Sequence, residues 1–157
     1  MLFPVLLACH VLAGLTATAC GAAAMLVRKR PGGHPFFGRI YGGALLVVVV
    51  TAFGMGVLHR PHVNHLLVVA GIAATAATIG YTARRVRWKG WLHWHISGMA
   101  LSYIALLTGF YVDNGPELPL WDLLPPVAFW FLPSAIGAPL LARALVRHRH
   151  RPRRPSV

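Results

Sequence analysis

The sequence predicts an all-α membrane protein built as a bundle of five transmembrane helices. Of its 157 residues, 57% are hydrophobic and only 11% are charged, a balance typical of integral membrane proteins. The 15 Lys and Arg side chains fall mostly between long apolar runs, as topology signals do, so the net charge of +12 does not indicate a nucleic-acid partner. Helices are expected because every backbone polar group must be paired within lipid.

Five apolar runs approach the roughly 20 residues that a helix needs to cross the hydrocarbon core. The expected spans cover residues 2–27, 40–58, 66–83, 91–112 and 126–145. Together they form one membrane domain, residues 1–146. The remaining residues 147–157 are mostly arginine, histidine and proline and are expected to form a disordered basic tail in the cytoplasm.

The first run is interpreted as a helix and not as a cleaved signal peptide. It lacks a basic amino-terminal region, and Arg28, Lys29 and Arg30 stand at its far end as a stop-transfer signal. Its two cysteines, Cys9 and Cys20, would lie about 16 Å apart on a helix, beyond the reach of a disulfide. We expect both to be small core residues.

The next two runs differ in their small residues. A basic loop over residues 28–39, broken by proline and glycine, is expected before the second span, in which residues 47–50 should face lipid and residues 54–56 should pack closely. In the third span, Val69, Ala73, Ala76 and Gly80 share one helix face. Such a face suits close approach of a neighbouring helix.

The fourth run is the one around which the rest of the chain is organised. His95, Gly98, Met99, Ser102 and Tyr103 recur at helical spacing, so one face is polar or small while the other is apolar. The fifth run contains Pro133 and Pro139 and is expected to be kinked or broken near mid-membrane.

The basic residues predict the orientation of the chain. Four Lys and Arg residues precede the second span, four precede the fourth span and six follow Leu141, against Arg60 alone on the opposite side. This bias places the amino terminus outside and the carboxyl terminus in the cytoplasm. Tryptophans fit the two interfaces: Trp88, Trp91 and Trp94 at the inner edge, Trp121 and Trp130 at the outer edge.

Histidines at the span ends suggest a b-type haem protein. Neutral imidazole is a common axial ligand of haem iron, and neighbouring glycines leave room for a porphyrin. His10 facing His65 or His59 would form an outer site, and His95 facing His34 or a neighbour an inner one, with basic inner-loop residues such as Arg39 holding the propionates. The favoured ligands are His10, His65 and His95, with His34 in reserve. His93 lies about 200° from His95 on the helix and cannot share its target.

A second hypothesis is a divalent metal site at the outer face. His59, His62 and His65 follow one another at intervals of three residues, and three imidazoles satisfy most of a tetrahedral site for zinc or copper. A polar interfacial turn explains the same spacing.

Two segments resemble a known family. One segment opens a span and contains His34, Gly38, Arg39 and Tyr41. A second segment, two spans later, contains His95, Gly98, Met99, Ser102 and Tyr103. Together they resemble domain-of-unknown-function family 2306, a family of small bacterial membrane proteins, over about residues 2–111. The resemblance implies a multi-pass protein of the bacterial cytoplasmic (inner) membrane and singles out His34, Arg39, His95, Met99 and Tyr103. The family usually has tryptophan where this chain has Gly98, a change expected to open space beside His95.

The leading hypothesis is therefore haem-linked electron transfer, with a quinone or a redox protein as partner. The alternatives are a metal-handling protein, a transporter, and a non-catalytic subunit of a homo- or hetero-oligomer, in which small-residue faces of the first, third and fourth helices dock a partner. No acid lies within a span and no catalytic template is recognisable, so the sequence names no catalytic residue.

Overall fold

The computed structural model describes residues 2–29, 32–58, 64–119 and 123–149, and it is all-helical over these residues. Five long helices follow one another: α1 (Leu2–Leu26), α2 (Gly33–Leu58), α3 (Asn64–Val86), α4 (Trp91–Asn114) and α5 (Ala128–Arg149). A short 3₁₀ turn, η1 (Gly115–Glu117), follows α4. All five helices are long and apolar enough to cross a membrane, which agrees with the predicted number of spans.

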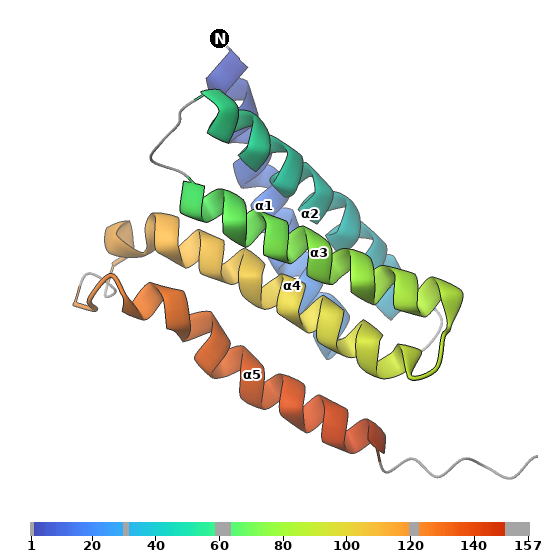
Figure 1. The fold of residues 1–157 in the computed structure, drawn as a ribbon. Helices are drawn as coiled ribbons and strands as arrows, with labels where there is room; N and C mark the ends of the chain where they lie inside the picture. The colour runs from blue at the N-terminus through green and yellow to red at the C-terminus, as the bar shows by residue number, and fades with distance from the viewer. Residues whose placement is uncertain (1, 30–31, 59–63, 120–122, 150–157) are drawn as a thin grey trace, which may run out of the picture.

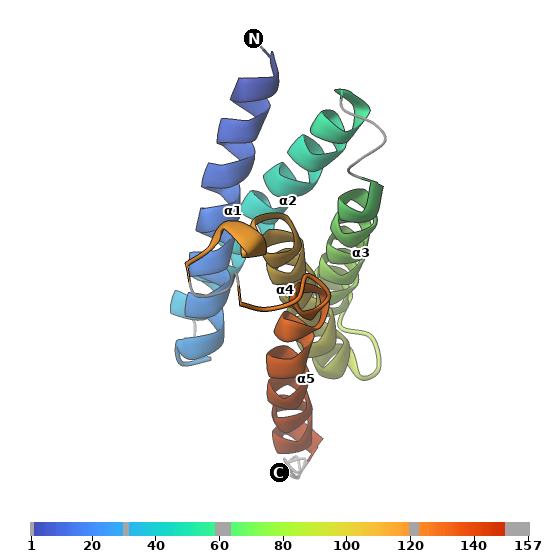
Figure 2. The ribbon, with the colours of Figure 1, turned by 90° about the vertical axis from the view of Figure 1, so that its left-hand side faces the viewer.

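The helices form two closely packed antiparallel pairs and one peripheral helix. α1 packs against α2 and α3 against α4, while α2 and α3 join the pairs and α1 touches α4 (Figure 1). α5 packs mainly against α4, and in the turned view it lies away from α1 and α2 (Figure 2). α4 thus contacts helices on three sides, as expected for the helix around which the chain is organised.

α2 and α5 extend beyond their expected spans, and α5, expected to be kinked or broken, is not broken. α2 begins at Gly33 and not near residue 40, because Pro35 occupies its first turn, where a missing N–H costs nothing. α5 continues to Arg149 through Pro133 and Pro139 without a break. Arg147 and His148 therefore belong to this helix and not to the tail, whose residues 150–157 lie outside the described part of the chain.

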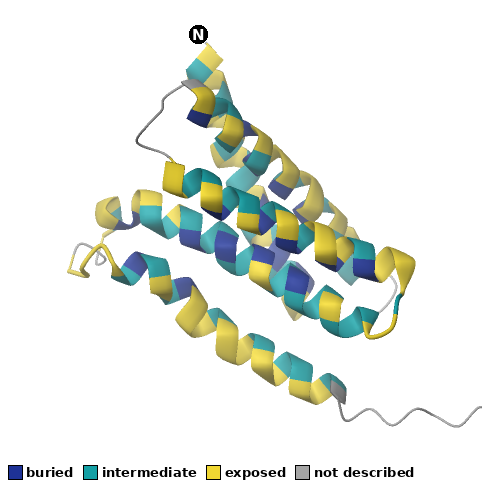
Figure 3. Cartoon of the chain, viewed as in Figure 1, coloured by how far each residue is buried: buried dark blue, intermediate teal, exposed yellow. Residues whose placement is uncertain are grey.

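Buried positions lie where the helices face one another, and many large apolar side chains are exposed on the outer surfaces of the helices (Figure 3). The core contains Ala17, Tyr41, Leu45, Val69, Ala73 and Ala105. Val47 and Val50 are exposed as predicted, but Val48 is buried, so the stretch 47–50 does not face lipid as a whole. Cys9 is exposed and Cys20 packs against the core, so only the second is a core residue.

The predicted small-residue face of α3 is confirmed: Val69, Ala73, Ala76 and Gly80 are all buried. Its tightest contact is with Gly98 of α4. A Cβ added at Gly98 would lie 2.6 Å from the carbonyl oxygen of Ala76 and 2.7 Å from the backbone nitrogen of Gly80. The space that Gly98 is expected to open beside His95 is thus filled by the α3 backbone.

Other glycines also serve contacts within the chain. A Cβ at Gly21 of α1 would lie 2.5 Å from the Tyr103 ring, and one at Gly115 would lie 2.7 Å from the ring of Phe129, which is 1% exposed. The small-residue faces of α1, α3 and α4 are consequently used inside the protomer. Docking of a partner subunit on small-residue faces stays a prediction.

Candidate functional site

The candidate site lies at the end of the bundle where α1, α3 and α5 finish and α2 and α4 begin (Figure 1). We call it the basic end, because it carries the cations of the segments that flank these helix ends; those described are Arg28, Lys29, Arg39, Arg84, Arg85, Arg87, Lys89 and Arg147. The described acids, Asp113 and Glu117, lie at the other end of α4, about 33 Å away by helix length.

His34 is fixed by the end of α1. It lies in the first turn of α2 and not in the predicted loop, and its Nδ1 is 2.8 Å from the carbonyl oxygen of Ala24. Lys29 donates to the same oxygen at 2.7 Å and to that of Met25 at 2.8 Å. The last turn of α1 is therefore capped by one imidazole and one ammonium, groups that suit the free carbonyls at a helix carboxyl end.

His95 is fixed in the same way by α3. Its Nδ1 is 2.9 Å from the carbonyl oxygen of Gly80. This bond is possible because Gly80 and Gly98 let the backbones of α3 and α4 approach to contact. The glycines thus position the histidine one turn before Gly98 against a main-chain acceptor.

The two histidines come together at the basic end. Their ring centroids are 6.4 Å apart and their planes are nearly perpendicular, at 88°. A carbonyl oxygen only accepts hydrogen bonds, so each Nδ1 carries the hydrogen and donates it. In a neutral imidazole the lone pair is then on Nε2, which is the nitrogen left to bind a metal or a proton.

Arg39 and Arg84 line an open hollow of about 660 Å³ next to this pair, together with Gly32, Gly33, Pro35 and Phe36. The sequence singles out Arg39 but identifies Arg84 only as a topology signal. Nothing local in the sequence indicates that the end of α3 and the start of α2 share a hollow.

The layer next to the histidines is a hydrogen-bonded core. The Tyr41 hydroxyl is 2.7 Å from Ser102 Oγ, and Ser102 in turn donates to the carbonyl oxygen of Met99 at 2.9 Å. Since Ser102 uses its hydrogen on Met99, Tyr41 donates to Ser102. Tyr103 donates to the carbonyl oxygen of Thr18 at 3.0 Å. Tyr103, predicted as a site residue, thus ties α4 to α1, while Met99, also predicted, accepts a bond within α4.

His10 and His65 have separate partners. His10 Nδ1 lies 2.9 Å from Thr51 Oγ1, and Thr51 donates to the carbonyl oxygen of Val47 at 2.7 Å, so His10 donates to Thr51. His65 is exposed in the first turn of α3, with its ring centroid 5.8 Å from that of Trp130. The structure therefore does not bring these two histidines together as an outer pair.

The predicted outer metal cluster falls largely outside the described residues, since His59 and His62 belong to the segment 59–63. Within the ranges that are described, no group of three or more His, Cys, Asp or Glu side chains converges. The cluster stays a prediction.

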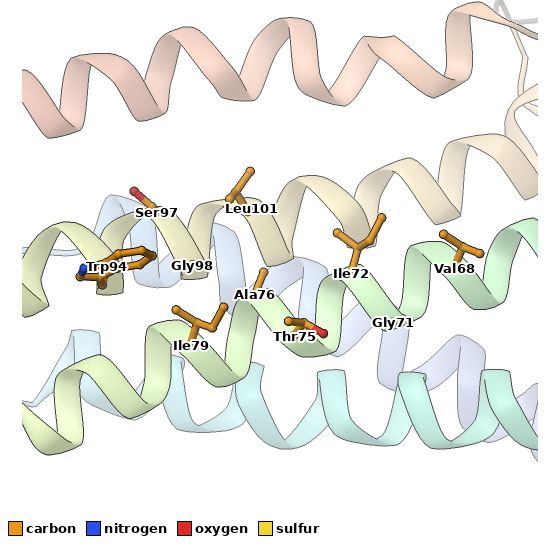
Figure 4. Close-up of a pocket in the computed structure, with 10 residues that line it drawn as sticks. All are labelled: Val68, Gly71, Ile72, Thr75, Ala76, Ile79, Trp94, Ser97, Gly98 and Leu101. Carbon is orange, nitrogen blue, oxygen red and sulfur yellow. The ribbon is translucent and has the colours of Figure 1, made fainter.

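A second hollow, a groove of about 470 Å³, runs between α3 and α4 on the outside of the bundle (Figure 4). Gly71 leaves it open, Ile72 and Ile79 form its α3 wall, and Leu101 lies on the α4 side. The sequence signal for it is the run of small residues on both helices. Its lining is almost wholly apolar, as suits contact with a lipid chain.

Comparison with family models, with curated proteins and with solved structures finds no match for this chain.

Proposed function

We propose that this protein is a small integral membrane haem protein for electron transfer, in which His34 and His95 would hold the haem at the basic end. The observation that carries the proposal is the convergence of these imidazoles from α2 and α4, each held through Nδ1 by a main-chain carbonyl. Bis-imidazole haem supplies one-electron oxidation and reduction.

The two rings lie close enough that one group could be held by both. The centroids of His34 and His95 are 6.4 Å apart. A hydrogen bond from Nδ1 to a carbonyl also fixes the tautomer and ring orientation that a ligating histidine needs. The chain thus supplies two imidazole side chains of fixed orientation, each with an Nε2 that is free among the described residues.

The setting supports an inner-membrane protein. Lys and Arg gather in the segments at the basic end, and this bias favours a cytoplasmic basic end, with the amino terminus outside and the carboxyl terminus inside. The resemblance to family 2306 involves the segments of His34 and His95, and we propose membership and a bacterial cytoplasmic membrane on that ground. Electrons would be exchanged with a quinone or a redox protein.

The test is a reduced-minus-oxidised visible spectrum of the detergent-purified protein, expressed with ample haem, together with pyridine extraction to count haem per chain. We expect a sharp reduced α-band. His34→Ala and His95→Ala should each abolish it, while His93→Ala should keep it, because position 93 lies on the same helix about 200° away. Circular dichroism would check that all three variants keep their helices.

Two results would overturn the proposal. The first is a flat spectrum from the unaltered protein; the second is an equal loss of haem in the His93→Ala control. A colourless protein that carries zinc or copper, lost in the His34 and His95 variants, would instead assign the same pair to a divalent metal. Zinc or copper retained in those variants but lost in His62→Ala would favour the outer cluster of His59, His62 and His65.

A further inference from the structure

From the hollow at the basic end we infer a second site, which binds the phosphate of an anionic phospholipid headgroup between Arg39 of α2 and Arg84 of α3. The inference does not depend on haem, because it concerns the hollow and not the imidazole pair. The bound group is a phosphate anion, which either a lipid headgroup or free inorganic phosphate supplies.

The first argument is that the two guanidinium groups lining this hollow have no partner. Neither makes an ion pair or side-chain hydrogen bond with any described residue, and the described acids, Asp113 and Glu117, lie at the other end of α4. Two cations that face one open space without a counter-ion leave a strongly positive hollow. Arginine suits a phosphate there because its planar fork of donors matches the phosphate oxygens.

The second argument is that three of the other cations at the basic end are already engaged. Lys29 caps α1 through two carbonyl oxygens. Arg85 lies 5.9 Å from the ring centroid of Tyr81, and Arg87 lies 5.9 Å from that of Trp91, both within cation–π distance. Arg39 and Arg84 differ from these three in having no such intramolecular use.

The third argument is the position and composition of the hollow. It lies beside the start of α2, whose first N–H groups favour anions, and its wall includes Phe36, which is 58% exposed. A phosphate near the guanidinium groups would let an acyl chain run along this aromatic side chain into the bilayer. The site thus combines a cationic head with an apolar exit, as a phospholipid requires.

The test is native mass spectrometry of the full-length protein in detergent with added phosphatidylglycerol, and with phosphatidylcholine as the zwitterionic comparison. We expect preferential retention of phosphatidylglycerol. Arg39→Gln and Arg84→Gln should each lower this retention by roughly fivefold, the usual contribution of one cation near an anionic headgroup. Arg85→Gln is the matched control, since it removes the adjacent cation, and its retention should stay near that of the unaltered protein. Circular dichroism would confirm that the variants keep their helices.

Added inorganic phosphate distinguishes the two sources. Phosphatidylglycerol that stays bound in millimolar phosphate identifies the lipid headgroup as the ligand. If phosphate displaces the lipid, and Arg39→Gln and Arg84→Gln again lower lipid retention, the hollow is an anion site at which free phosphate competes with the lipid. Failure to bind either probe would overturn the inference. So would equal losses in the Arg84→Gln and Arg85→Gln variants.

Discussion

Adding a single methyl group at Gly98 should separate α3 from α4. The Cβ of Gly98→Ala would lie 2.6 Å from the carbonyl oxygen of Ala76 and 2.8 Å from Cα of Gly80, whereas ordinary contacts begin at 3.4 Å. All these atoms are backbone, so no side chain can swing away. The two helices must therefore move apart by about 0.8 Å.

The energetic cost has two parts. Overpacking of this kind usually costs about 1–3 kcal/mol. The separation would also stretch the bond from His95 to the Gly80 carbonyl from 2.9 Å toward a length at which it no longer counts as a hydrogen bond. Loss of that bond adds about 0.5–1.5 kcal/mol. The total expected destabilisation is about 2–4 kcal/mol relative to a glycine-to-alanine change without a clash.

Gly109→Ala provides that reference. Gly109 is on the same helix, and its added Cβ would meet Val69 at 3.6 Å, an ordinary contact. The gain in helix propensity, about 1 kcal/mol, is common to both variants and cancels in the comparison. The assay is unfolding in mixed micelles with increasing sodium dodecyl sulfate, followed by circular dichroism. If both variants unfold within about 0.5 kcal/mol of each other, the close contact of α3 and α4 is refuted.

Two further changes test the core. Ser102→Ala leaves the buried Tyr41 hydroxyl without an acceptor and should lower the free energy of unfolding by about 1–3 kcal/mol in the same assay. Tyr41→Phe removes the donor itself and should lower it by about 1 kcal/mol. A larger loss in Tyr41→Phe than in Ser102→Ala would contradict the assigned direction of this bond. Gly21→Ala should destabilise the protein by about 1–3 kcal/mol, because its Cβ would meet the Tyr103 ring at 2.5 Å. Gly14→Ala, whose Cβ would have nothing within 4 Å, should be neutral or stabilising. Equal effects of the two changes would exclude the close packing of α1 on α4.

The two segments that resemble family 2306, around His34 and His95, show what local sequence patterns can predict. The stripe on the fourth run predicts that His95, Met99, Ser102 and Tyr103 face protein, and all four lie on the packed side of α4. What the stripe meets is not predictable from it. The Gly80 carbonyl, the Tyr41 hydroxyl and the end of α1 are brought there by helices distant in sequence, and a backbone carbonyl leaves no signal in residue identity.

His34 illustrates the limit most clearly. Proline and glycine around it predict a loop, because these residues usually break helices, yet Pro35 in a first turn costs nothing and the helix begins at Gly33. The change places the imidazole against α1 and beside His95. In contrast, the histidines His59 and His62 lie outside the described residues, so the structure does not test their predicted cluster.

The sequence by itself determined the five helices that are long and apolar enough to cross a membrane and the packing face of α3, because apolar length and small-residue periodicity are local properties. Only the tertiary structure decided which ends share a site. Lipid is as apolar as the helix surfaces, so helix pairing depends on shape and on a few hydrogen bonds. The meeting of His34 with His95, and of Arg39 with Arg84, follows from the contact of Gly80 with Gly98 and from the capping of α1, which no single helix encodes.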